Sequence, residues 1–124
     1  MQTTIMNKTV TATTAPDKRM AITRGGGVSL QLTTTTCTAT WKIYGSNKPG
    51  ADADGDAEAS DITSAFKKPD GNAVDNPAGS PTSQIVQAGG CFFAYIWAQL
   101  EGASGGGTAR VYGNEVNLVP AGAQ

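Results

Sequence analysis

Four carboxylate side chains lie two residues apart in one stretch of the chain: Asp52, Asp54, Asp56 and Glu58. Alternate side chains on a curved loop can converge on one hard cation, and Ca²⁺ prefers many oxygen ligands. The sequence therefore predicts either a calcium site or a solvated acidic loop that keeps a strand end soluble. The stretch is not an EF-hand loop, because Ala57 stands where that motif needs Gly and Thr63 stands where it needs Glu.

The other reactive side chains form no catalytic arrangement. The chain contains no histidine, which removes the commonest general base and the commonest zinc ligand. Serine and threonine hydroxyls are plentiful, but no base is at hand to activate one. The carboxylates crowd into one loop, whereas a glycosidase needs two of them held apart across a cleft. We therefore expect no enzymatic activity and no cofactor, calcium excepted.

The composition predicts a single β-rich domain. The chain has 124 residues, only 15% of them charged, and a net charge of −1. Gly, Thr and Ala are abundant, while strong helix formers are scarce. The nine basic residues are scattered and form no stripe, so nucleic acid is not an expected partner.

The N-terminal sequence predicts where the protein is made, and that compartment predicts the redox state of the cysteines. Residues 1–5 are polar and unlike a signal peptide, and no stretch approaches the length of an apolar membrane helix. We expect synthesis in a host cytoplasm, without a membrane partner. Cys37 and Cys91 are then expected to be reduced and buried, with a disulfide between them as the alternative.

The stretch 91–100 predicts a long central strand. It contains no charge, Pro or Gly, and its aromatic content favours a strand over a helix. Its even positions, including Phe92, Ile96 and Leu100, are predicted to face the core. Its odd positions form a second apolar surface, named the aromatic face: Phe93, Tyr95 and Trp97. This face either contacts another subunit or is covered by the N-terminal strand or a long loop of the same chain.

Alternating patterns predict the other strands. Val28, Leu30 and Leu32 alternate with polar residues, as do Trp41 and Ile43 farther along, so all five side chains are predicted to be core. Turn signals separate roughly seven or eight such stretches, the pattern of an antiparallel β-sandwich or jelly roll. The fold class is therefore all-β, and a glycine-rich loop is predicted to join the stretches 91–100 and 108–112 as a hairpin.

The same patterns divide the chain into three parts. Residues 1–14 are predicted as an N-terminal edge strand or arm, with Val10 and Ala12 inward. Residues 15–119 form the sandwich, and residues 120–124 form a flexible tail. Two long polar loops, 46–60 and 67–81, interrupt the sandwich, and loops of that length in a compact domain usually carry function.

Several features together resemble small β-sandwich proteins of tailed-phage virions. A strand ending in the sequence WKIYGSN (41–47) leads into a variable loop and then into the sequence DIT (61–63). The aromatic strand and a Gly-rich closing segment follow, so the resemblance covers residues 25–115. The chain departs from the pattern at Ala59-Ser60, where Trp is usual, and on the aromatic strand, which lacks the usual Arg.

The resemblance implies a virion structural protein, and we favour a capsid decoration (cement) protein. Such a protein binds a preformed head shell as a homo-oligomer, commonly a trimer, with the major capsid protein or other virion proteins as partners. Segment 1–14 would be free to pair with a neighbour's sheet edge, and the aromatic face would supply the subunit contact. One alternative is a carbohydrate- or receptor-binding module of a tail or fibre, using Trp41, Tyr44 and the long loops. Another is a minor head–tail or tail component.

Overall fold

The alternating segments pair into two antiparallel sheets in a computed structural model, which describes residues 2–23, 26–48, 59–89 and 93–116. Sheet A has the strand order β1-β9-β4-β7, and sheet B has the order β2-β8-β5-β6, with β3 also paired to β8. The described strands are β1 (Gln2–Thr9), β2 (Thr13–Thr14), β3 (Met20–Ala21), β4 (Gly27–Thr34), β5 (Thr38–Ser46), β6 (Ser60–Asp61), β7 (Thr82–Ala88), β8 (Tyr95–Ser104) and β9 (Thr108–Val116). A short 3-10 helix, η1 (Thr63–Ala65), follows β6. The predicted all-β antiparallel sandwich is confirmed.

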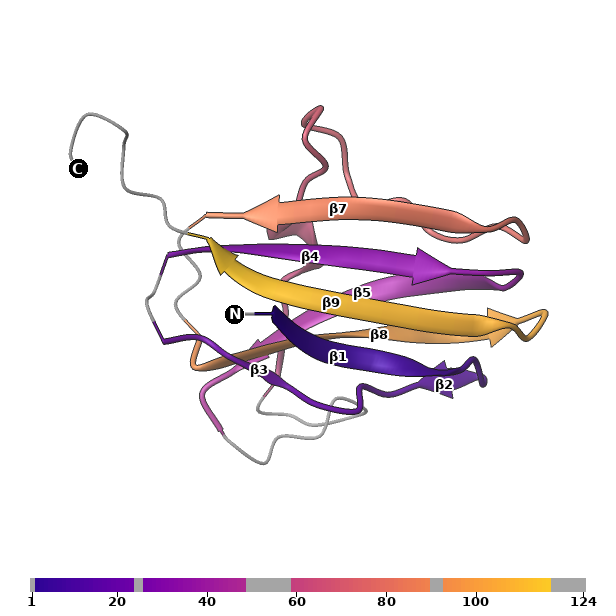
Figure 1. Ribbon diagram of the computed structural model, residues 1–124, viewed down its shortest axis with the longest axis horizontal. Coiled ribbons are helices and arrows are strands. Elements are labelled where there is room, and N and C mark those ends of the chain that lie inside the picture. Colours follow the sequence, from indigo (N-terminus) through magenta and orange to yellow (C-terminus); the bar gives the residue numbers. More distant parts are fainter. Residues whose placement is uncertain (1, 24–25, 49–58, 90–92, 117–124) are drawn as a thin grey trace.

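The two sheets are stacked, and the chain crosses between them repeatedly. Figure 1 shows sheet A in front, with β7, β4, β9 and β1 from top to bottom and with β5 and β8 behind them. Except between β2 and β3 and between β5 and β6, each strand is followed by a strand of the other sheet. Repeated crossing between two antiparallel sheets is typical of a β-sandwich.

The core fills the space between the sheets. The predicted core residues that the structure describes are all buried: Val28, Leu30, Leu32, Trp41, Ile43, Ile96 and Leu100. Phe92 lies outside the described residues. Because side chains of a strand alternate between its two faces, the period-two pattern identified the inward faces of β4, β5 and β8 correctly.

The predicted hairpin between 91–100 and 108–112 is wrong. β8 pairs with β5 in sheet B, whereas β9 pairs with β1 and β4 in sheet A. The turn between them therefore carries the chain from one sheet to the other, and its three glycines, Gly105, Gly106 and Gly107, all have positive φ angles. A glycine-rich turn marks a chain reversal in either arrangement, so the turn signal alone cannot distinguish them.

The N-terminal segment is an edge strand and not a free arm. β1 lies at the edge of sheet A and pairs with β9 along its length. A register shift between Thr4 and Met6 accompanies the burial of both Ile5 and Met6. After β1 the chain crosses to sheet B, where β2 pairs with β8, so Val10 is buried but Ala12 is exposed, contrary to the prediction for Ala12.

We predict that Gly113→Ala destabilises the sandwich. A Cβ at this position would lie 2.6 Å from Met20 Sδ, 3.0 Å from Ile5 Cδ1 and 3.1 Å from Leu30 Cδ2. Overpacking of this kind lowers the free energy of unfolding by about 1–3 kcal/mol. Urea denaturation measures the change, with Gln31→Ala on the exposed side of β4 as a control expected to stay within about 0.5 kcal/mol. Equal stabilities of the two variants would contradict the packing described here.

Candidate functional site

The predicted calcium ligands Asp52, Asp54, Asp56 and Glu58 lie outside the described residues. Among the residues that the structure describes, no group of three or more His, Cys, Asp or Glu side chains is placed to hold a metal ion. The calcium site therefore stays a prediction. The described polar clusters lie elsewhere, along the edge of β5 and on the outer face of β8.

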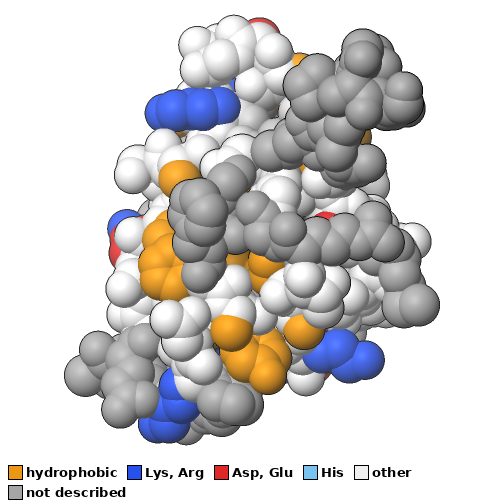
Figure 2. All heavy atoms as spheres, turned by 90° about the vertical axis from the view of Figure 1, so that its left-hand side faces the viewer, with side chains coloured by type: hydrophobic (Ala, Val, Ile, Leu, Met, Phe, Trp, Pro, Cys, Tyr) orange, Lys and Arg blue, Asp and Glu red, His pale blue; other side chains and the backbone are white. Residues whose placement is uncertain are grey.

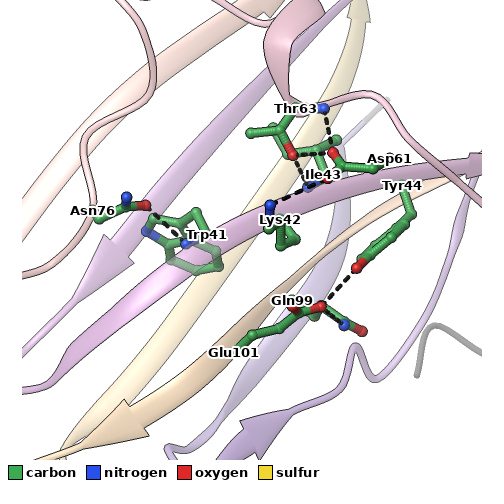
Figure 3. Close-up of polar contacts among 9 residues, drawn as sticks. All are labelled: Trp41, Lys42, Ile43, Tyr44, Asp61, Thr63, Asn76, Gln99 and Glu101. Carbon is green, nitrogen blue, oxygen red and sulfur yellow. Dashed lines mark hydrogen bonds and ion pairs between the residues drawn. The ribbon is translucent and has the colours of Figure 1, made fainter. Parts of the chain in front are cut away.

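The edge of β5 is closed by loop residues, an arrangement named the edge lock. The backbone N–H of Ala39 donates to the carbonyl oxygen of Pro77 at 3.1 Å, and that of Trp41 donates to Asn76 Oδ1 at 2.9 Å. Farther along, Ile43 N–H donates to Thr63 Oγ1 at 2.8 Å (Figure 3). An open strand edge invites pairing with another chain, and these contacts satisfy its donors one after another.

The segment Asp61-Ile62-Thr63 holds this lock in place. Asp61 Oδ1 accepts from Thr63 N–H at 3.0 Å and from Thr63 Oγ1 at 2.6 Å. Asp61 Oδ2 accepts from Lys42 Nζ at 3.2 Å, and Figure 3 shows Lys42 and Asp61 side by side on neighbouring strands. The DIT sequence, which is part of the resemblance, thus holds the edge lock of β5 in place through these hydrogen bonds.

Local contacts set the charge state of Asp61. Burial alone would raise the pKa of its carboxyl group, but the hydrogen bonds from Thr63 and the neighbouring Lys42 ammonium group outweigh burial and lower the pKa below its ordinary value of 3.8. The ionised carboxylate is therefore the form that the folded chain favours.

Trp41 is unavailable for stacking on a sugar. It borders an open hollow next to the edge lock, but its side chain is core and the residue is 1% exposed. Tyr44 is partly buried: it stacks against Trp97 with ring centroids 6.1 Å apart, and its hydroxyl donates to Glu101 Oε2 at 2.7 Å. The carbohydrate-binding alternative therefore loses Trp41, whereas no contact in the structure tests Tyr44.

The outer face of β8 is aromatic near its start and polar farther along. Trp97 is fully buried there, because Tyr44 stacks on it and Arg19 lies over its ring at 5.0 Å from the centroid. Gln99 is 1% exposed, and its side-chain amide donates to Glu101 Oε2 (Figure 3). Residues of the same chain thus cover Trp97, so this member of the aromatic face is not free to contact another subunit.

Phe93 and Tyr95, the other members of the aromatic face, are only partly buried. Phe93 packs over Gly45, where a Cβ would lie 2.6 Å from the Phe93 ring. It borders an open hollow together with Ser46, Asn47, Lys48 and Ser60. These two aromatic side chains therefore remain candidates for an interaction surface, and no contact in the structure tests that role.

Sequence reasoning missed Arg19, Asn76 and Glu101. The odd positions of β8 continue from Trp97 through Gln99 to Glu101, so the alternation could have identified that row. Arg19 and Asn76 act across the fold, from segments without a regular pattern, and no local signal points to them. Of the cysteines, Cys37 is a buried free thiol, as expected, and Cys91 lies outside the described residues.

Comparison with protein-family models, with curated proteins and with solved structures gives no match to this chain. Within the described residues, no helix has the length and apolar character needed to cross a membrane. The functional argument therefore depends on the geometry above and on the sequence resemblance.

We predict that Thr63→Val weakens the edge lock. Valine has nearly the same shape but leaves the Ile43 N–H and Asp61 without their hydroxyl partner. The free energy of unfolding should fall by about 1–3 kcal/mol, while Thr63→Ser, which keeps the hydroxyl, should retain most of the stability. Urea denaturation of both variants measures the difference, and equal losses would show that the hydroxyl is not what matters.

We also predict that Asp61 makes stability depend on pH in acid. Its folded-state pKa is lowered, so its contribution is present above the ordinary value of 3.8 and is lost as the pH falls through the folded value. Wild-type stability should therefore fall more steeply below about pH 4 than that of Asp61→Asn, which has no carboxyl group to protonate. Thermal unfolding across this range measures the slopes, and parallel curves would rule out the role of Asp61.

Proposed function

We propose that this chain is a structural protein of a tailed-phage virion, namely a decoration protein that assembles with copies of itself on the head shell. The sequence resemblance of residues 25–115 suggests the setting. One structural observation supports assembly: apolar side chains stay partly exposed at one end of the sandwich. They are named the end patch and consist of Ile22, Phe93 and Tyr95.

The members of the end patch come from neighbouring segments. Ala21 pairs directly with Tyr95, and the Ile22 N–H donates to the Ala94 carbonyl oxygen at 2.8 Å, which holds Ile22 beside the start of β8. β8 begins at the left-hand end of the molecule in Figure 1. Figure 2 views this end directly and shows several hydrophobic side chains at its surface, among polar and undescribed ones.

Partly exposed aromatic residues favour association. Removing apolar surface from water is favourable by about 25 cal/mol per Å², and interface cores are enriched in Tyr and Phe. Two of the three residues predicted for the subunit contact, Phe93 and Tyr95, belong to the end patch. The proposed interface therefore keeps Phe93 and Tyr95 from the predicted contact and leaves out the buried Trp97.

We predict that Tyr95→Asp disrupts self-association. A carboxylate in a buried contact between subunits is unfavourable without a partner, so the dissociation constant should rise at least about tenfold. The matched control is Ile85→Asp, which places the same charge on β7 at a side chain that is 45% exposed and lies outside the end patch. Size-exclusion chromatography with light scattering measures both variants.

The wild-type chain should be oligomeric at micromolar concentration and should co-sediment with head shells of the phage that encodes it. The Ile85→Asp variant should behave like the wild type in both assays. A wild-type chain that stays monomeric and does not bind shells would overturn the proposed function.

A further inference from the structure

The N-terminal residues 2–23, named the strap, close one side of the sandwich across both sheets. β1 pairs with β9 in sheet A, whereas β2 and β3 pair with β8 in sheet B. The strap also contributes four side chains to the core: Ile5, Met6, Val10 and Met20. Without the strap, β8 and β9 would each present an open edge beside an uncovered part of the core.

The slot that receives the strap fits it closely. Gly113 on β9 leaves the space that Met20 and Ile5 fill, since a Cβ there would approach them to 2.6 Å and 3.0 Å. Backbone bonds fix the strap at further points: Val10 N–H donates to the Gly107 carbonyl at 2.9 Å and Ala103 N–H to the Ala12 carbonyl at 2.9 Å. The slot therefore recognises this particular segment.

The strap also holds itself together. The backbone N–H groups of Asp17 and Lys18 donate to the Ile5 carbonyl oxygen at 2.8 and 3.1 Å. The Asp17 carboxylate accepts from the Asn7 N–H at 2.9 Å and pairs with Lys8 at 3.1 Å. These contacts close the outer edge of β1 and connect β1 to the later part of the strap. Because all of these residues belong to the strap, the strap can move as one unit.

Loop residues cover parts of two other described edges. The edge lock covers β5, and on β7 the Gln87 N–H donates to the Lys67 carbonyl oxygen at 2.8 Å while the Lys67 N–H donates to the Gln87 carbonyl oxygen at 3.0 Å. A strand arriving from another molecule would meet a loop at these points. The slot along β8 and β9 is different, because strands β1, β2 and β3 fill it, and strand pairing can re-form with the same segment of another copy.

The contacts beneath the strap are incompletely satisfied. Trp97 Nε1 and Gln99 Oε1, both on the outer face of β8, are buried without a hydrogen-bond partner in the part of the chain that the structure describes, and Arg19 of the strap lies over the Trp97 ring. An unpaired buried polar atom is destabilising and gains partners when water reaches it. Opening of the strap therefore recovers part of the interaction energy that it loses.

We infer that the strap is exchanged between copies, so that the strap of one chain occupies the slot of another. Every contact within the slot can re-form between molecules, which makes exchange nearly neutral in energy and favours it where copies are concentrated. The sequence joining the strap and β4 contains two consecutive glycines, Gly25 and Gly26, and glycine restricts the backbone less than any other residue. The inference rests on the proposed assembly of copies and specifies how neighbouring copies are joined.

A designed disulfide tests the exchange. Asn7 on β1 and Arg110 on β9 are exposed and directly opposite, so Asn7→Cys and Arg110→Cys together should link the strap to whichever sandwich holds it. The double variant is incubated at a series of concentrations, oxidised and run on a denaturing gel without reductant. Exchange predicts covalent dimers and larger species whose share rises with concentration, whereas each single variant should give no such ladder.

The outcomes separate this inference from the proposed function. If the double variant links only within single chains while light scattering still shows oligomers, the exchange is wrong and the assembly stands. If the chain is monomeric at every concentration and all linkage is internal, both are wrong. Mixing two copies of different length provides a second readout, because exchange produces a linked species of intermediate size in the double variant that mixtures of the single variants should not give.

Discussion

Open sheet edges are the constraint on which this structure depends. A two-sheet sandwich has four edges, and each presents unpaired backbone donors and acceptors unless something covers it. Here the covering groups come from segments outside the long strands. Asn76, Pro77 and Thr63 bond to the edge of β5, Lys67 bonds to the edge of β7, and the turn at Asp17 bonds to the edge of β1. The long loop 67–81 therefore has a structural role, since its residues Lys67, Asn76 and Pro77 bond to the edges of β7 and β5.

The outer face of sheet B also has to be covered, in this case by a side chain of the strap. An aromatic strand such as β8 cannot leave both faces in water, and the strap, which pairs along its edge, places Arg19 over Trp97. The guanidinium group lies over the indole ring at 5.0 Å from its centroid, and Trp97 is fully buried as a result of this cover and of Tyr44. Of the aromatic side chains on this face of β8, Tyr95 therefore stays partly exposed whereas Trp97 does not.

Much of the fold could be predicted from local patterns. Alternation identified the inward faces of β4, β5 and β8. What failed depends on tertiary pairing. No local rule says whether the turn at Gly105–Gly107 joins strands of one sheet or of two, and none says that Arg19 meets Trp97. The prediction for Ala12 failed for the same reason, because the chain leaves sheet A after β1 and pairs with β8 in sheet B from Thr13.

The pairing of β1 with β9 has a consequence for the order of folding. Gln2 lies opposite Asn114, so β1 is synthesised long before the strand with which it pairs. Pairings so far apart in sequence form slowly, because a long loop must close before the strands gain their contacts. Until β9 has been synthesised, Ile5 and Met6 lack the pairing that places them in the core, and their apolar side chains can contact other nascent chains. Contact between copies of this chain is therefore favoured during translation.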